Sequence, residues 1–229
     1  MTVMTTPTSE RNDTLLPGGV RRPPTVHELM TDDGEPMESY FHVMQMMLLI
    51  DSLTRHWGDR DDVFCGGNQF MYFSPDQVKT HDYRGPDFYA VCGNTTRQGR
   101  LAWVVWEEDG RTPDCIIELH SPATRHVDLG VKKDIYEQRL HIKDYVVYEP
   151  LSDAVQGWHL TGDGYVPMVP NAAGRLPCPS IGLEVGVWHG RHLKTPGNWL
   201  RFFLPDGQLV QTAAEAAEDG AQRAETEAQ

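Results

Sequence analysis

At 229 residues, the chain is long enough to bury one hydrophobic core, and its 39% of hydrophobic residues is typical of a soluble globular protein. Its four cysteines are widely scattered, which argues against a zinc ribbon or a redox dithiol. The formal net charge of -13 argues against a broadly basic surface that binds nucleic acids through Lys and Arg. DNA binding would therefore be weak unless a local basic face or an oligomer, such as a homodimer, supplies positive charge.

Neither a targeting segment nor a membrane span is expected. The opening run, Met1 to Asp13, is polar and lacks the apolar stretch of a signal peptide. The most apolar stretch, Val43 to Leu53, is too short to span a bilayer and includes Gln45 and Asp51. We therefore expect a cytoplasmic protein with no membrane partner.

Composition divides the chain into three parts. Residues 1–24 are rich in Thr, Pro and Arg, which predicts a disordered leader. Residues 25–206 hold the apolar and aromatic segments, and we expect them to form one domain. Residues 207–229 are rich in Ala and Glu without a strong apolar stripe, which indicates a helical or disordered tail.

The first predicted elements are helical. Thr25 is a suitable N-cap for a short helix through Met30. From Met37 to Trp57, apolar residues recur every three or four positions, which predicts one long amphipathic helix. Short apolar or aromatic segments bounded by turn residues then predict strands at Phe70–Phe73, Asp87–Cys92, Leu101–Trp106 and Cys115–Leu119.

The next elements form a strand, helix and strand unit. Helical periodicity returns from Thr124 to Leu140, and Tyr145–Tyr148 has strand character. Such a βαβ crossover should be right-handed. Further strands are predicted around Val155–Leu160, Leu183–Trp188 and Leu200–Leu204.

The segment from Pro113 to His120 places two acids in an otherwise apolar strand. Asp114 and Glu118 would lie on one face of that strand, because side chains alternate with period two. Buried carboxylates are costly unless they are paired or bind a metal ion. Glu118 also falls at the carboxyl end of the strand, where α/β folds place their sites. A divalent cation there would polarise a phosphate oxygen, so these residue types suit phosphodiester hydrolysis.

Strand geometry predicts which acid joins Glu118. Four residues of extended strand separate Asp114 from Glu118 by about 13 Å, too far for one ion without a bulge. Asp87 stands at the start of an earlier predicted strand, and antiparallel pairing would bring it to Glu118. The strand predicted at Leu101–Trp106 could instead lie between the two, which would separate them.

The helix that follows carries a candidate catalytic cation. Asp128, Lys132 and Tyr136 are spaced four residues apart, so they share one helix face. Lys132 can reach toward the strand end, where its charge would orient an attacking water and stabilise the transition state. The alternative is a structural face on which Asp128 simply pairs with Lys132. Asp114 would then cap an edge, and a neighbouring Arg or a backbone amide would satisfy the Glu118 carboxylate by donating a hydrogen bond.

Three linked motifs lie between Gly85 and Pro150. They are Pro86-Asp87, Pro113-Asp114-(three residues)-Glu118-(two)-Ser121-Pro122, and Asp128-(three)-Lys132-(three)-Tyr136. Together they resemble the Uma-type family of restriction endonucleases, in the PD-(D/E)XK nuclease superfamily. The clear resemblance is confined to this run, and its three motifs are fairly specific in combination.

This resemblance implies a restriction-endonuclease-like α/β fold, with a mixed central sheet flanked by helices. It also implies Mg²⁺ or Mn²⁺ as cofactor and DNA as substrate. The metal ligands would be Asp87, Asp114 and Glu118, and Lys132 would be the catalytic lysine. His120 stands where the superfamily pattern has Lys, so Lys132 is expected to take over that role. The acidic charge and His120 motivate the rival hypothesis, an inactive nuclease-fold module for binding or assembly.

Overall fold

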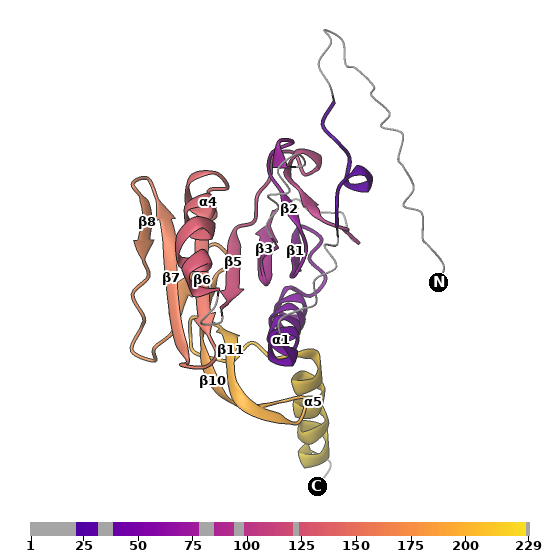
Figure 1. Cartoon of the computed structure of the whole chain (residues 1–229). Helices are drawn as coiled ribbons and strands as arrows, with labels where there is room; N and C mark the ends of the chain where they lie inside the picture. The colour runs from indigo at the N-terminus through magenta and orange to yellow at the C-terminus, as the bar shows by residue number, and fades with distance from the viewer. Residues whose placement is uncertain (1–21, 32–38, 78–84, 94–98, 121–123, 228–229) are drawn as a thin grey trace, which may run out of the picture.

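The structure is a computed structural model that describes residues 22–31, 39–77, 85–93, 99–120 and 124–227 (Figure 1). The helical elements are η1 (Val26–Glu28), α1 (Tyr40–Trp57), η2 (Val105–Glu107), α3 (Arg125–Val127), η3 (Asp128–Lys132), α4 (Lys133–Gln138) and α5 (Ala213–Glu227). The strands are β1 (Val63–Gly66), β2 (Met71–Tyr72), β3 (Phe88–Cys92), β4 (Trp103–Val104), β5 (Cys115–Leu119), β6 (Asp144–Glu149), β7 (Ala154–Thr161), β8 (Gly164–Pro167), β9 (Leu176–Cys178), β10 (Leu183–His192) and β11 (Thr195–Phe203).

A six-stranded sheet forms the centre of the fold, in the order β1-β3-β5-β6-β7-β8. β5 and β6 run parallel and are connected through α3, η3 and α4, whereas the other neighbouring strands pair antiparallel. Two smaller sheets accompany it, with the orders β11-β10-β9 and β2-β4. The predicted mixed central sheet flanked by helices is therefore confirmed.

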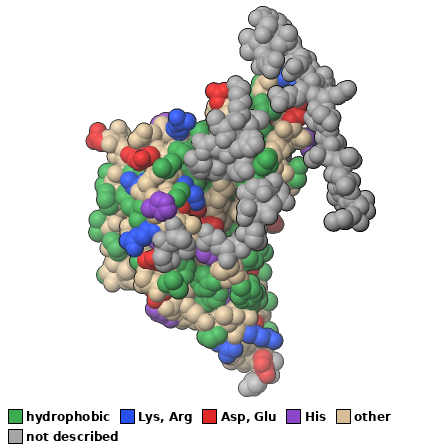
Figure 2. All heavy atoms as spheres, in the orientation of Figure 1, with side chains coloured by type: hydrophobic (Ala, Val, Ile, Leu, Met, Phe, Trp, Pro, Cys, Tyr) green, Lys and Arg blue, Asp and Glu red, His purple; other side chains and the backbone are tan. Residues whose placement is uncertain are grey.

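Charged side chains lie in small groups on the face of the molecule that Figure 2 shows. On the face that Figure 2 shows, Lys and Arg side chains are interspersed with Asp and Glu rather than gathered in one large area. The chain has 33 acidic and 20 basic residues, and its basic residues are not concentrated on this face. None of the described helices is long and apolar enough to cross a membrane.

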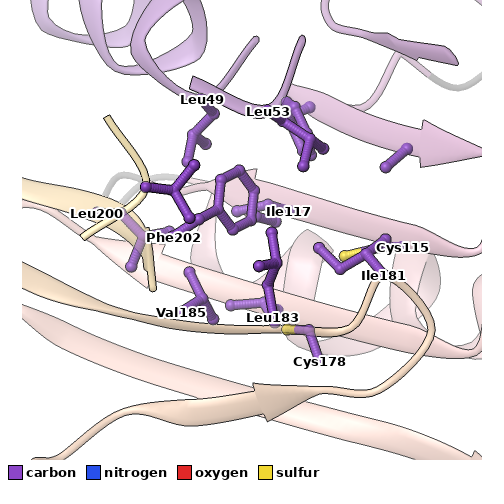
Figure 3. Close-up of a cluster of buried hydrophobic side chains, with 14 of the residues drawn as sticks. Leu49, Leu53, Cys115, Ile117, Cys178, Ile181, Leu183, Val185, Leu200 and Phe202 are labelled. Carbon is purple, nitrogen blue, oxygen red and sulfur yellow. The ribbon is translucent and has the colours of Figure 1, made fainter. Parts of the chain in front are cut away.

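One face of the central sheet packs against α1 and the β9–β11 sheet. Leu49 and Leu53 of α1 belong to the same buried cluster as Ile117 of β5 and Phe202 of β11. Figure 3 shows the Phe202 ring among these side chains. Full burial of such a side chain contributes about 1.5–3 kcal/mol relative to leaving it exposed. The cluster therefore fixes α1 and β11 against β5.

The opposite face of the central sheet packs against α4. Ile116 joins a second buried cluster with Tyr145 of β6 and with Tyr136 and Leu140 from the helical segment. Ile116 and Ile117 enter different clusters because successive strand side chains point to opposite faces. Burial of Tyr136 fixes the rotation of the helix, and with it the direction of the polar residues on the same face.

Local sequence features explain where helix α1 begins and where it ends. Ser39 precedes its first turn, and the hydroxyl oxygen of Ser39 accepts the backbone N–H of His42 at 3.3 Å. Gly58 follows its last turn with φ of 59°, a left-handed value that favours glycine. The helix therefore starts slightly later than the predicted Met37 and ends at the predicted Trp57.

One predicted strand is shorter than expected, and three strands were missed. The strand predicted at Leu101–Trp106 is limited to β4, which pairs parallel with β2 and is followed by η2. It does not lie between β3 and β5, which pair directly with each other. The short strands β1, β8 and β9 were not predicted. The tail is helical as α5, and residues 1–21 of the predicted leader lie outside the described residues.

Candidate active site

Asp87 and Glu118 meet where β3 begins and β5 ends. Antiparallel pairing places Phe88 opposite Ile117, so the next pair along the ladder is Asp87 and Glu118. The Oδ2 atom of Asp87 accepts the backbone N–H of Leu119 at 2.7 Å. Glu118 Oε2 accepts the backbone N–H of Asp87 at 3.4 Å. The predicted juxtaposition of the two acids is thus present, while their role as metal ligands stays a prediction.

The helical segment after β5 brings Lys132 to this acidic pair. Lys132 Nζ lies 3.1 Å from Glu118 Oε2 and 2.9 Å from Asp128 Oδ1. The Tyr136 hydroxyl donates to Glu118 Oε1 at 2.8 Å. Asp128, Lys132 and Tyr136 therefore share one face directed at Glu118, as their spacing predicts.

The backbone of this helical segment is irregular at the site. The segment Asp128–Lys132 is kinked at Gly130, whose φ of -115° and ψ of -105° are not helical. The Tyr145 hydroxyl donates to the Asp128 carbonyl oxygen at 2.9 Å and so ties the stretch to β6. The kinked segment carries both Asp128 and Lys132.

The site concentrates negative charge in a buried position. The side chains of Glu118 and Asp128 are 1% and 3% exposed, whereas that of Lys132 is 22% exposed. Burial and the charge of Glu118 raise the pKa of Asp87 well above its ordinary value. Burial alone would lower the pKa of the Lys132 amine, but the charges of Glu118 and Asp128 outweigh burial and raise that pKa. Lys132 is therefore a permanent ammonium at neutral pH.

The donor set suits a hard divalent cation. Asp87 and Glu118 offer carboxylate oxygens from adjacent strands, and Mg²⁺ is commonly held by one or two carboxylates together with water and substrate phosphates. Within the described residues, no group of three His, Cys, Asp or Glu side chains is placed to hold an ion. The two acids fit a site that substrate and water would complete.

Asp114 is not part of this site, which corrects the expectation that it is a third metal ligand. It precedes the first residue of β5, whereas Glu118 is near the end of that strand. Its Oδ2 atom accepts the Cys92 backbone N–H at 2.7 Å, and its Oδ1 atom pairs with Lys143 Nζ at 2.6 Å. Extended strand geometry keeps the two acids at opposite ends of β5. Asp114 instead links β3 to the start of β6 at the opposite end of the strands, through Cys92 and Lys143.

His120 occupies the position where the superfamily pattern has Lys, but it provides no comparable charge. Its side chain is 3% exposed, and burial lowers its pKa. Its Nδ1 atom has no hydrogen-bond partner in the part of the chain that the structure describes, and its Nε2 atom lies 4.0 Å from Glu149 Oε1. The ammonium beside Glu118 therefore comes from Lys132 and not from His120.

One contact at the site could not be predicted from spacing. His42 of α1 places its Nε2 atom 2.7 Å from the carbonyl oxygen of Leu119, and Ser39 Oγ lies 3.0 Å from its Nδ1 atom. The N-cap pattern at Ser39 indicates where the helix begins. Nothing in the sequence indicates that this first turn abuts the end of β5.

A mixed central sheet with two acids and a lysine at the end of one strand defines a restriction-endonuclease-like α/β protein. Residues 21–195 match the Uma2 family, described as "Putative restriction endonuclease", and the chain belongs to this family. The resemblance seen in the three motifs is thereby confirmed.

Two other proteins are similar to this chain over part of its length. An uncharacterized protein of Synechocystis sp., slr1290, is 27% identical over 111 residues, which cover 48% of this chain and 55% of that protein. The chain thus spans about half the length of that relative. A crystal structure from Anabaena variabilis, titled as a putative nuclease belonging to DUF820, has a TM-score of 0.41 and 12% identity. The match covers 69% of this chain and 97% of that one.

Proposed function

We propose that this protein is a Mg²⁺- or Mn²⁺-dependent endonuclease that hydrolyses phosphodiester bonds in DNA. The observation that carries the proposal is the group formed by Asp87, Glu118 and Lys132, with the Lys132 amine 3.1 Å from Glu118 Oε2. The description of the Uma2 family supports the same reaction class. A phosphodiester is an anion, and its hydrolysis needs positive charge and an activated water at one place.

Asp87 and Glu118 are the residues that would hold the cation. When bound, a divalent cation polarises a phosphate oxygen and lowers the pKa of the attacking water. The Leu119 backbone N–H fixes one oxygen of Asp87, and the Tyr136 hydroxyl fixes one oxygen of Glu118. Both carboxylates are therefore oriented before any ligand arrives, which reduces the cost of binding.

Lys132 would act through its charge. Because its pKa is raised, its amine donates hydrogen bonds at neutral pH and does not accept a proton. From its place beside Glu118, it would orient the attacking water and stabilise the negative charge that builds on the phosphate oxygens. Asp128, at 2.9 Å, is a positioning residue that holds the amine toward the strand end.

A second candidate function is a nuclease-fold module that binds or assembles without hydrolysis. The observation that favours it is His120, which is buried and carries no fixed charge where the superfamily pattern has Lys. The net charge of -13 also opposes tight DNA binding. A protein of this kind would keep the fold and lack any metal-dependent nicking.

Plasmid nicking in Mg²⁺ or Mn²⁺ tests the proposal. Lys132→Met should lower the nicking rate by about 100-fold or more, the order expected when a group that stabilises transition-state charge is removed. Lys133→Met is the matched control, because the Lys133 amine lies 5.1 Å from the centroid of the Trp158 ring and pairs with no acid of the site. The control should nick at a rate close to that of the parent protein.

Two outcomes would contradict the endonuclease proposal. Folded parent protein that leaves plasmid intact in both metals would favour the non-catalytic module. Parent-like nicking by Lys132→Met would show that the hydrolytic centre lies elsewhere.

The variant Asp114→Asn tests whether Asp114 takes part in the site formed by Asp87, Glu118 and Lys132. Asparagine keeps an acceptor for the Cys92 backbone N–H but loses the ion pair with Lys143, so the free energy of unfolding should fall by about 1 kcal/mol. Nicking should continue at the parent rate, because Asp114 lies away from the acidic pair. Urea unfolding and the nicking assay give the two readouts. If Asp114→Asn folds normally but no longer nicks, then Asp114 is part of the hydrolytic site.

A further inference from the structure

The long hairpin formed by β10 and β11 extends beyond the small sheet to which it belongs. The two strands pair from Glu184 with Phe203 to His192 with Thr195. The third strand, β9, pairs only with residues Leu183 to Val185 of β10. Most of the hairpin is therefore a two-stranded ribbon, and Figure 1 shows it curving away from the central sheet.

Two cations, Arg191 and Lys194, are exposed at the end of the ribbon, whereas acids from other segments contact its strands at Asn198, which donates to Asp153 Oδ2, and at Arg201, which pairs with Glu215. No acidic residue occurs between Glu184 and Asp206, although the chain contains 33 of them. Arg191 and Lys194 are exposed near the turn, and no ion pair to either is found within the described residues. At the lower end of the view in Figure 2, where Figure 1 places this hairpin and the acid-rich helix α5, Lys and Arg side chains lie next to Asp or Glu side chains. This part of the chain is a candidate for the local basic face that DNA binding requires.

The turn itself has a conformation that its residues do not favour. Leu193 and Lys194 join the strands with φ of 43° and 69°, the left-handed values of a type I′ hairpin turn. Such turns favour Asn-Gly, so a Leu-Lys turn carries backbone strain. The Leu193 side chain is also 64% exposed. An exposed leucine in a strained turn contributes little to the fold, which indicates a role outside folding.

The ribbon is anchored at the same end of the central sheet as Glu118. The Tyr148 hydroxyl, near the end of β6, donates to the Asn198 carbonyl oxygen at 2.9 Å. In the register of the parallel pair, Tyr148 lies opposite Leu119, the residue after Glu118. Phe41, in the first turn of α1, stacks on Trp199 with ring centroids 4.8 Å apart. The ribbon therefore meets the central sheet at the end where Glu118 lies, on the face opposite to the one where Tyr136 and Lys132 contact Glu118.

We infer that the end of this ribbon, defined as the basic tip and consisting of His189, Arg191, Leu193 and Lys194, binds duplex DNA that extends past the Glu118 end of the central sheet. Arg191 and Lys194 contact backbone phosphates, and Leu193 makes an apolar contact in a groove. Two-stranded ribbons fit DNA grooves, and apolar side chains at such tips contact base steps. The inference rests on the proposed function for the identity of the ligand, since both require DNA.

Binding is measured separately from hydrolysis. The parent for this experiment carries Glu118→Gln, and fluorescence anisotropy follows a labelled duplex in EDTA over a range of salt concentrations. Arg191→Gln with Lys194→Gln should weaken binding by about tenfold or more at low salt. The slope of log K against log salt should also become shallower by about 2, because each phosphate contact contributes about 0.9. Arg55→Gln with Arg139→Gln is the charge-matched control, since both residues are exposed and lie outside the ribbon.

A third variant, Leu193→Asn, separates a binding role from a structural one. Asparagine tolerates the left-handed turn better than leucine, so the melting temperature should rise. DNA affinity should fall several-fold, because the apolar contact is lost while both charges remain. A purely structural turn would show the rise in melting temperature with no loss of affinity.

The inference is overturned if the Arg191 and Lys194 variant keeps the parent affinity and salt slope. Equal losses in the control pair, or tighter binding of single-stranded RNA than of duplex DNA, would overturn it as well. The two proposals fail separately. Loss of binding in the tip variants with no nicking by the unmutated protein would support DNA binding and refute hydrolysis. Nicking by the unmutated protein, together with unchanged DNA binding in the tip variants, would support hydrolysis and refute DNA binding by the basic tip.

Discussion

Glu118→Gln should abolish metal-dependent nicking, with a loss of about 1000-fold or more. A neutral amide cannot supply the charge that binds a divalent cation, and it no longer holds the Lys132 amine by an ion pair at 3.1 Å. The two effects act on the same step, so this single change removes more activity than the loss of Lys132 alone. A plasmid assay with Mg²⁺ and Mn²⁺ over long incubations measures the residual rate.

The same change should leave the fold largely intact. Three carboxylates, from Asp87, Glu118 and Asp128, surround one lysine, so removing one negative charge relieves repulsion as well as breaking a pair. Glutamine also keeps an acceptor for the Tyr136 hydroxyl. We expect the free energy of unfolding to change by less than about 1 kcal/mol, since functional sites commonly trade stability for activity. An unfolded variant, or one that nicks at the parent rate, would contradict the assignment of Glu118.

Glu215→Gln should cause the largest loss of stability that we expect from a single surface-accessible change. Arg201 of β11 is 0% exposed, and its two terminal nitrogens pair with the Glu215 carboxylate at 2.8 and 2.7 Å. Removing that carboxylate leaves a buried guanidinium without its counter-charge, a loss of about 3 kcal/mol. Urea unfolding at pH 7 measures it, and Glu218→Gln, an exposed residue of the same helix, is the matched control.

The stability supplied by Glu215 should depend on pH in a defined direction. Burial raises the pKa of Glu215, but hydrogen bonds from Arg201 and Thr212 outweigh burial and lower it overall. A lowered folded-state pKa means that the stabilisation is complete above the ordinary glutamate pKa of about 4.3 and is lost as pH falls through the lower folded value. The difference between parent and Glu215→Gln should therefore shrink below about pH 4. A difference that stays constant down to pH 2.5, or an equal loss in Glu218→Gln, would contradict this account.

The strands that build the site are among the elements best predicted from sequence. Cys115–Leu119 matches β5 at both ends, because Asp114 and His120 interrupt a short apolar run there. The antiparallel approach of Asp87 to Glu118 followed from the position of each acid in its strand. The helical face that carries Lys132 followed from four-residue spacing, and the contact between Asp128 and Lys132 forms despite the kink at Gly130.

Other features depended on contacts that local sequence does not encode. The segment Leu101–Trp106 has strand composition, yet only Trp103 and Val104 find a partner strand, in β2. The strand that begins at Leu183 was predicted to end at Trp188, but β10 continues to His192 because backbone pairing in a ribbon does not require apolar side chains. The family resemblance implied that Asp114 binds metal, whereas the extended geometry of β5 had already indicated otherwise.

Calorimetric titration with Mn²⁺ tests the central claim most directly, because it asks whether Asp87 and Glu118 form one cation site. We expect the parent protein to bind Mn²⁺, Asp87→Asn and Glu118→Gln to lose that binding, and Asp114→Asn to retain it. Absence of binding in the parent protein, or loss of binding in Asp114→Asn with retention in Glu118→Gln, would contradict a metal site at the junction of β3 and β5.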